Sequence, residues 1–248
     1  MTQTMPARAR CGRCRRPLSH CLCAYIPAVP HRTPVLVLQH PDEARHPLNT
    51  ARLAVLGLRH AELRTGERFP DLDRIIAGAG RAVLLFPAAH DHAPMRTPRP
   101  SGRGQARQFQ NTAPQAPPYR GGEAPADTAG VLHGVAGPDP PRAQGADDRA
   151  PLLIVPDGTW RKARKIVHLN PVLGTLPRLS LPPGEPSEYR VRKAPGGAAV
   201  STIEAIARAL KALEPEGDFE PLLRPFRVLV EQQITAMGEE IYRRNYPG

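Results

Sequence analysis

The sequence predicts an α/β fold with a mostly parallel sheet, because short buried strands and helices follow one another along the chain. Apolar runs typical of buried strands occur at 34–39 (PVLVLQ), 81–86 (RAVLLF) and 152–155 (LLIV). Segments with helical spacing lie between them, as at 47–58, where Leu53, Leu56 and Leu58 share that spacing. Strands separated by helices are typical of parallel sheets.

The same patterns place the remaining elements. Helices are predicted at 47–58, 71–79, 159–169, 201–213 and 219–237. The fourth of these begins with a capping box formed by Ser201 and Glu204, and the last is interrupted near Pro225. Short extended segments are predicted at 176–181 (LPRLSL) and 188–192 (EYRVR).

Residues 91–149 have a different composition from the rest of the chain. They are dense in Pro, Gly, Ala and Arg and follow neither the strand period nor the helix period. Such a segment buries too little apolar surface to offset the entropy of ordering it. We therefore predict a small N-terminal unit at 1–30 and a main domain at 31–248 with a disordered insertion at 91–149, which serves as a passive linker or contacts RNA.

The charge balance indicates a polyanionic partner. The chain of 248 residues carries 34 Lys and Arg against 23 Asp and Glu, a net charge of +11. An excess of this size suits nucleic acid, although a basic surface also keeps a protein soluble. The N-terminus has no apolar signal-peptide core, and no apolar run reaches the roughly 20 residues that span a bilayer. We expect a soluble cytoplasmic protein with no membrane association.

The four cysteines of the chain are clustered in CGRCRRPLSHCLC, at Cys11, Cys14, Cys21 and Cys23. Two disulfides are one possible arrangement, but they are rare in the cytoplasm. Four thiolates at this spacing can enclose a tetrahedral zinc ion, and four protein ligands leave no position open for a substrate. We predict a structural zinc knuckle. The arginines beside it, among them Arg13, Arg15 and Arg16, either contact phosphates or form a solvated face.

The stretch LLIVPDGTWRKARK, at 152–165, places polar side chains where a buried strand ends. Ligands bind beyond the carboxyl ends of the strands in open α/β sheets, so Asp157, Thr159 and Trp160 are candidate site residues. Asp157 could instead cap the following helix, and Trp160 could be a core residue. Arg161, Lys162, Arg164 and Lys165 on that helix either meet phosphates or are simply solvated.

Several segments, taken in order, resemble one known family. These are the cysteine knuckle, LQHPDE with NTARL, LLFP, PDGTWRKA, LPRLSL, YRVRKAP and STIEA. Together they are similar to the DTW-domain family of tRNA-uridine aminocarboxypropyltransferases, over residues 11–90 and 151–240. Departures are small: Pro156 precedes Asp157, Val200 to Ile203 replace a usual Leu-Ser-Thr-Leu, and the insertion is long.

The resemblance implies a SPOUT-like fold whose knotted C-terminal region forms an S-adenosylmethionine pocket. It also implies a reaction, the transfer of the 3-amino-3-carboxypropyl group of S-adenosylmethionine to N3 of a uridine in tRNA, with release of 5′-methylthioadenosine. A carboxylate near N3–H can accept its proton, and Asp157 is the candidate base. Holding the donor's amino group is the other role open to Asp157. Thr159 would orient Asp157 or bind the donor, and Trp160 would offer a flat face to a base or wall the pocket.

The remaining candidates are assigned to the donor pocket, again through the resemblance. They are His40, Pro41, Glu43 and Thr50 after the first strand, and Arg178, Tyr189 and Arg192 near the cofactor loops. An arginine among them could pair with the carboxylate of the transferred group. No protein partner is implied.

Two other functions are compatible with parts of the sequence. A non-catalytic zinc-knuckle factor in RNA binding or ribosome assembly would explain the charge and the cysteines. A SPOUT-type RNA methyltransferase would use the same donor molecule. The products separate the three possibilities.

Overall fold

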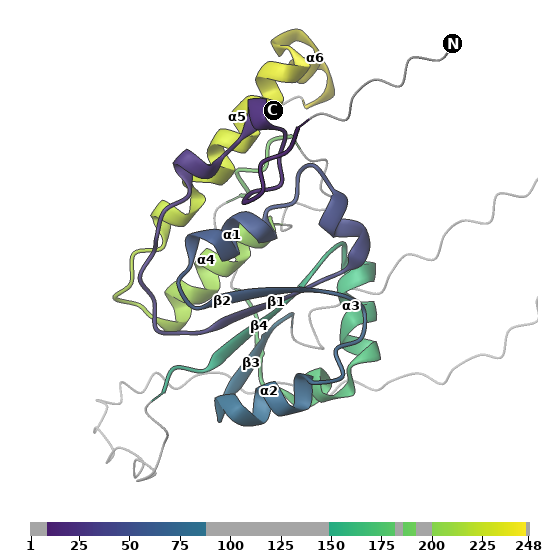
Figure 1. The fold of residues 1–248 in the computed structure, drawn as a ribbon, viewed down its shortest axis with the longest axis vertical. Helices are drawn as coiled ribbons and strands as arrows, with labels where there is room; N and C mark the ends of the chain where they lie inside the picture. The colour runs from purple at the N-terminus through teal and green to yellow at the C-terminus, as the bar shows by residue number, and fades with distance from the viewer. Residues whose placement is uncertain (1–8, 88–148, 182–185, 192–199, 247–248) are drawn as a thin grey trace, which may run out of the picture. The chain divides into compact units, whose positions relative to one another are not determined.

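The structure is a computed structural model that describes residues 9–87, 149–181, 186–191 and 200–246. Its centre is a sheet of five parallel strands in the order β2-β1-β4-β3-β5 (Figure 1). The strands are β1 (Val35–Gln39), β2 (Ala61–Thr65), β3 (Ala82–Leu85), β4 (Leu152–Asp157) and β5 (Arg178–Leu179). The predicted parallel α/β architecture is confirmed.

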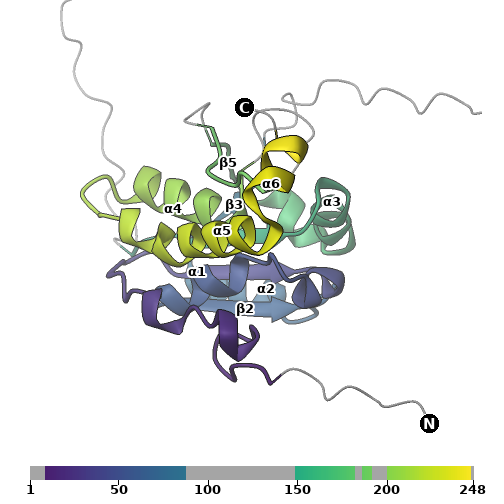
Figure 2. The same cartoon turned by 90° about the horizontal axis from the view of Figure 1, so that it is seen from above.

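Helices cover both faces of the sheet. They are α1 (Ala51–Gly57), α2 (Leu72–Ala79), α3 (Trp160–Leu169), α4 (Thr202–Leu213), α5 (Arg224–Met237) and α6 (Glu239–Asn245). The 3-10 turns are η1 (Leu18–His20), η2 (Cys23–Tyr25), η3 (Pro41–Arg45), η4 (Pro171–Thr175) and η5 (Glu220–Leu223). Helices α1, α4 and α5 lie on one side of the strands, and α2 and α3 on the other (Figures 1 and 2).

The alternation of side chains along β1 explains this layering. Val35 and Val37 belong to the core beneath α1 and α4, whereas Leu36 and Leu38 belong to the core beneath α2 and α3. Successive side chains of a strand point to opposite faces, so an uninterrupted apolar strand needs cover on both sides. Strand β1 is fully buried because β2 and β4 flank it and helices cover both of its faces.

The predicted elements agree with the structure except in three places. Residues 188–191, the described part of the predicted extended segment 188–192, form a bend and a turn rather than a strand. Strand β2 and helix α6 were not predicted. The predicted insertion at 91–149 falls almost entirely outside the described residues, and so does part of the region predicted to be knotted. In the described parts of the chain, no helix combines the length and apolarity that a membrane span requires.

Candidate functional site at the carboxyl ends of the strands

The carboxyl ends of the central strands lie level with one another. In the sheet register, Gln39 at the end of β1 is opposite Thr65 of β2 on one side and Asp157 of β4 on the other. Side chains that come from distant parts of the sequence therefore meet at one edge of the sheet. This edge is where ligands bind in parallel α/β folds.

Asp157 is the buried acidic group of this edge, with only 5% of its surface exposed. Its Oδ2 atom accepts hydrogen bonds from Gln39 Nε2 at 2.9 Å and Asn49 Nδ2 at 3.4 Å. Its Oδ1 atom accepts one from Thr202 Oγ1 at 2.5 Å. The side chain therefore does not cap α3, whose N-cap is Thr159 and which has no side-chain cap bond. The helix-cap interpretation of Asp157 is wrong.

The donors to Asp157 are residues that the sequence analysis did not select. Gln39 ends β1, Asn49 precedes α1, and Thr202 begins α4. All three stand in segments that carry the resemblance, namely LQHPDE, NTARL and STIEA. Their position in those segments was the available signal, but nothing in the linear sequence shows that these segments converge on one carboxylate.

Burial and hydrogen bonding act in opposite directions on Asp157. Removal from water raises its pKa above the ordinary value, while the bonds from Thr202, Gln39 and Asn49 lower it, and the nearby Glu43 carboxylate adds to the rise. The net direction is upward. Asp157 is thus a stronger base than an exposed aspartate, and the described residues occupy only one of the two acceptor positions of Oδ1.

The turn after β4 depends on a glycine. Gly158 has φ of +152°, and a Cβ atom there would lie 2.9 Å from Lys162 Cβ. Both facts exclude ordinary side chains, since positive φ is strained for L residues. The turn brings Thr159 to an exposed N-cap position and starts α3 immediately beyond Asp157.

Trp160 lies at the rim of the site rather than in the core. Half of its surface (50%) is exposed, and its ring meets that of buried Phe86 edge to face, with 5.9 Å between the centroids. The guanidinium of Arg178 lies 5.5 Å from the centroid of the same Phe86 ring and donates to the carbonyl oxygen of Pro87 at 3.0 Å. The core interpretation of Trp160 is therefore wrong, and Trp160 and Arg178 contact the same phenylalanine ring.

The residues after the first strand that were predicted to line the donor pocket make contacts within the protein. His40 is buried; its Nδ1 accepts from the Asp42 backbone N–H and its Nε2 lies 2.8 Å from Glu67 Oε1. Pro41 begins the 3-10 turn that His40 caps. Thr50 is buried, and its Oγ1 accepts from the Ile203 backbone N–H at 3.4 Å, which joins the starts of α1 and α4.

Two of the basic residues predicted to contact RNA form ion pairs. Lys162 Nζ lies 2.9 Å from Glu43 Oε1 and 3.4 Å from Asp42 Oδ2. Lys165 Nζ lies 2.8 Å from Glu67. These pairs connect α3 with the segments that follow β1 and β2. Arg161 and Arg164 on the same helix are exposed.

The segment before α4 is fixed by Glu204. This buried carboxylate completes the predicted capping box with Ser201 and also accepts from Ser187 Oγ at 2.7 Å and from the Glu188 backbone N–H at 2.8 Å. Next to it, Tyr189 is buried and donates to the Leu48 carbonyl oxygen at 2.7 Å. Arg192, predicted to bind the donor, lies outside the described residues.

The four cysteines form a group that could hold a metal ion, with all four sulfur atoms within 4.8 Å of one another. They are free thiols rather than disulfides, and Sγ–Sγ distances are 3.6 Å for Cys11 with Cys23 and 3.8 Å for Cys14 with Cys21. Zinc–sulfur bonds of 2.3 Å in a tetrahedron require sulfur atoms about 3.8 Å apart, so the donor set fits this metal.

The thiols of this cluster differ in acidity. Backbone N–H groups of Cys14 and Arg13 lower the pKa of Cys11 to about 6, whereas desolvation and the neighbouring sulfurs raise that of Cys23 to about 12. Zinc binds thiolates, so metal binding would release protons here.

The arginines of the knuckle have unequal surroundings. Arg13 and Arg15 are exposed. Arg16 is half-buried; its Nε donates to the His20 carbonyl oxygen and its Nη1 to that of Pro47 at 2.8 Å. Arg16 therefore ties the knuckle to the segment that carries Asn49. Burial lowers the pKa of its guanidinium.

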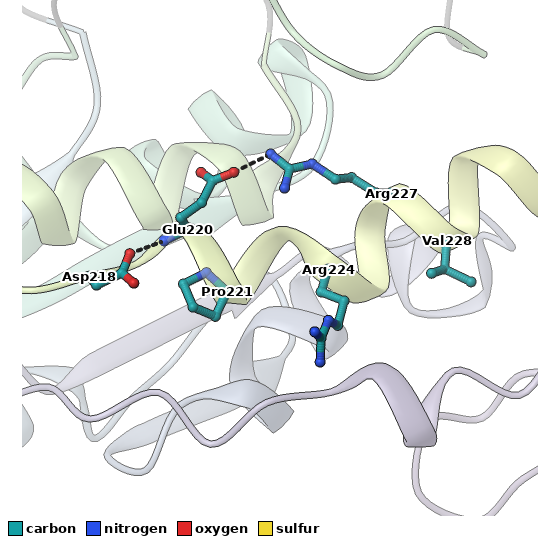
Figure 3. Close-up of a pocket in the computed structure, with 6 residues that line it drawn as sticks. All are labelled: Asp218, Glu220, Pro221, Arg224, Arg227 and Val228. Atoms are coloured by element: carbon teal, nitrogen blue, oxygen red, sulfur yellow. Dashed lines mark hydrogen bonds and ion pairs between the residues drawn. The ribbon is translucent and has the colours of Figure 1, made fainter.

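A separate hollow lies at the start of α5 (Figure 3). Asp218, Glu220, Pro221, Arg224, Arg227 and Val228 line it. Arg227 donates to the carboxylates of Glu220 and Glu188, so its charge is already compensated. None of the residues that line the hollow contributes to the contacts of Asp157 or Trp160, and we assign it no function.

Comparison with known proteins identifies the family of this chain. Residues 8–234 match the DTW domain. The chain belongs to the DTW domain family. The site tetrapeptide Asp157-Gly158-Thr159-Trp160 lies within the matched range.

Curated relatives of this DTW-domain chain are named tRNA-uridine aminocarboxypropyltransferases. One from Drosophila melanogaster is 27% identical over 241 residues, which cover 92% of this chain and 76% of the relative. One from Arabidopsis thaliana is 30% identical over 226 residues, covering 85% of this chain and 75% of the relative. No solved structure matches the chain.

Proposed function

We propose that the chain transfers the 3-amino-3-carboxypropyl group of S-adenosylmethionine to N3 of a uridine in tRNA and releases 5′-methylthioadenosine. Family membership and the names of the relatives support this activity. The observation that carries it to this chain is Asp157, a buried carboxylate with a raised pKa at the carboxyl edge of a parallel sheet.

In the proposed step, Asp157 accepts the N3 proton of the uridine at Oδ1. The N3 electron pair forms a bond to the aminocarboxypropyl carbon that is attached to sulfur. The bond between that carbon and sulfur breaks, and its electrons neutralise the sulfonium, which leaves as 5′-methylthioadenosine. Proton removal by a positioned carboxylate contributes typically 10²–10⁴-fold to such a rate. The side-chain amides of Gln39 and Asn49 donate hydrogen bonds that hold the carboxylate in place. The sulfonium activates all three carbons bonded to it, so positioning of the two substrates selects the carbon that is attacked.

We propose zinc as the metal of the cysteine cluster, with a structural role. Four cysteines satisfy tetrahedral zinc and leave no open position, so the metal would take no part in the transfer. Leu22, between the third and fourth ligands, is fully buried in the core that contains α1 and α5. The metal would therefore hold Leu22 in its place in this core.

We also propose that the fold is SPOUT-like, with a knotted C-terminal region that forms the donor pocket. The parallel sheet and the position of β4 between β1 and β3 are compatible with it. The segment between β5 and α4 lies partly outside the described residues, so an experimental structure with S-adenosylmethionine is the test of this topology.

Product analysis tests the proposed reaction. The purified protein is incubated with S-adenosylmethionine and unmodified tRNA, and the nucleosides are separated by mass. We expect 5′-methylthioadenosine together with one uridine heavier by the aminocarboxypropyl group, and neither product without tRNA. S-adenosylhomocysteine would show methyl transfer instead, and the absence of both products would leave an RNA-binding protein.

A further inference from the structure

Three residues from three different strand ends form a small platform beside the site. Phe86 follows β3, Trp160 follows β4, and Arg178 begins β5. Phe86 is the common support, because its ring contacts both the indole of Trp160 and the guanidinium of Arg178. Phe86 was not among the residues selected from the sequence.

Both outer members of the platform are fixed on one side and open on the other. Half of the surface of Trp160 is exposed, although its ring packs against the buried Phe86. Arg178 is exposed, and its bond to the Pro87 carbonyl oxygen uses one of the five N–H donors of the guanidinium. An exposed indole and a held guanidinium that share one supporting phenylalanine ring match a nucleobase with an anionic group in the same nucleotide or its neighbour.

We propose that this platform binds an unpaired nucleotide of the RNA, with its base stacked on Trp160 and a backbone phosphate bound by Arg178. The assignment rests on the proposed function, which supplies RNA as the substrate. The geometry favours RNA over S-adenosylmethionine as the ligand, because half of the Trp160 surface is exposed at the rim, next to the exposed Arg161. Arg178 thus binds phosphate here instead of the donor's carboxylate.

Trp160 is the only tryptophan of the chain, so its fluorescence reports directly on the platform. We expect oligouridylate to quench this fluorescence saturably and S-adenosylmethionine alone to leave it nearly unchanged. Quenching by S-adenosylmethionine and not by oligouridylate would assign the indole to the donor and overturn the proposal.

Substitution separates the two contacts. Trp160→Leu should weaken oligouridylate binding roughly 10-fold to 100-fold, the range that loss of one base–aromatic stack produces. Arg178→Ala should weaken it and reduce the salt dependence by about one phosphate contact. Arg81→Ala is the matched control, since Arg81 is exposed and precedes β3 at the opposite edge of the sheet. Labelled RNA measured by anisotropy gives these affinities, and calorimetry with S-adenosylmethionine should show unchanged donor binding in both site variants.

The outcomes for the platform and for the proposed reaction are separable. If the wild-type protein forms 5′-methylthioadenosine but Trp160→Leu binds RNA as tightly as the Arg81→Ala control, the platform is refuted and the reaction stands. If no 5′-methylthioadenosine forms but oligouridylate quenches Trp160 and the two substitutions weaken binding, the platform stands and the reaction does not.

Discussion

Asp157 is almost completely buried, and its carboxylate accepts hydrogen bonds from three side-chain donors. Burying a charge costs free energy unless hydrogen bonds compensate for it. The hydrogen bonds from Gln39, Asn49 and Thr202 offset that cost in part, and the pKa of Asp157 stays raised because burial and the nearby Glu43 carboxylate outweigh them.

Asp157→Asn tests the role of this charge. If Asp157 is the base, turnover should fall on the order of 10²–10⁴-fold while S-adenosylmethionine and tRNA bind nearly as before. Asparagine keeps the shape of the side chain and an oxygen for the amide donors. Steady-state kinetics and calorimetry are the measurements. A loss of donor affinity with little loss of turnover would instead assign Asp157 to the donor's amino group.

The same variant makes a prediction about stability and pH. Because the pKa of Asp157 is raised in the folded state, the folded protein binds the Asp157 proton more tightly than the unfolded chain does. The stability that this gives is present below the unfolded pKa and is lost as pH rises through the folded pKa. We expect the free energy of unfolding of the wild type, relative to Asp157→Asn, to increase as pH is lowered through that range. Denaturant unfolding at several pH values would show this, and a pH-independent difference would mean that Asp157 does not titrate there.

Thr202→Val should move the pH profile. The Thr202 hydroxyl donates to Asp157 Oδ1 and lowers the carboxyl pKa, so its removal raises that pKa further. The acid limb of kcat/KM should shift to higher pH, and the free energy of unfolding should fall by about 1–3 kcal/mol. Thr235→Val, at an exposed position of α5, is the control. An unshifted limb with normal folding would show that Thr202 does not set the basicity of Asp157.

At the scale of elements, the N-terminal knuckle offers the clearest test. We expect about one zinc ion per chain in protein purified without added metal, and loss of order in residues 9–30 on chelation. Metal analysis and amide exchange are the measurements. Cys14→Ser should reproduce the chelated state, whereas Ser19→Ala, an exposed residue of the same segment, should not. Fully folded, metal-free protein would contradict the assignment.

Elements with strong local signals were predictable from the sequence, and those without them were not. The capping box of Ser201 and Glu204 and the apolar run of β1 are confirmed. Strand β2 lies at the edge of the sheet and is partly exposed, and it contains charged residues. Its sequence pattern therefore does not resemble that of a buried strand. In 188–191, Val191 and Tyr189 are buried as in a strand, but Glu204 holds the segment in a turn.

The site was predictable only in part, for a related reason. Asp157 was identified because it is a polar residue at the end of a buried strand, and Trp160 was selected because it lies close to Asp157 in the sequence. Gln39 and Thr202 belong to other segments, and only the sheet register and the packing of α4 bring them to Asp157. Phe86 was missed because an aromatic residue at the end of an apolar run is usually core.

At the scale of the whole molecule, the insertion separates two strands that pair with each other. Strands β3 and β4 are parallel neighbours, so the chain leaves β3 at the site edge and must enter β4 at the opposite edge. We expect replacement of residues 94–147 by a Gly-Ser linker to leave turnover largely intact, provided the linker has at least about a dozen residues, as parallel crossovers need.

Kinetics with S-adenosylmethionine and tRNA measure this effect, and a scrambled insertion of the original length is the control. Loss of turnover in the linker variant with normal donor binding would show that the insertion itself holds RNA.

The position of β1 has a consequence for how the chain is made. Val35 of β1 pairs with Ala61 soon after synthesis, but its other neighbour, Leu153, emerges only after the whole insertion has been translated. During that interval β1, apolar except for Gln39, has an unpaired edge, and unpaired strand edges promote aggregation. A longer insertion therefore lengthens the time for which this edge is unpaired during synthesis, independently of any effect on the finished protein.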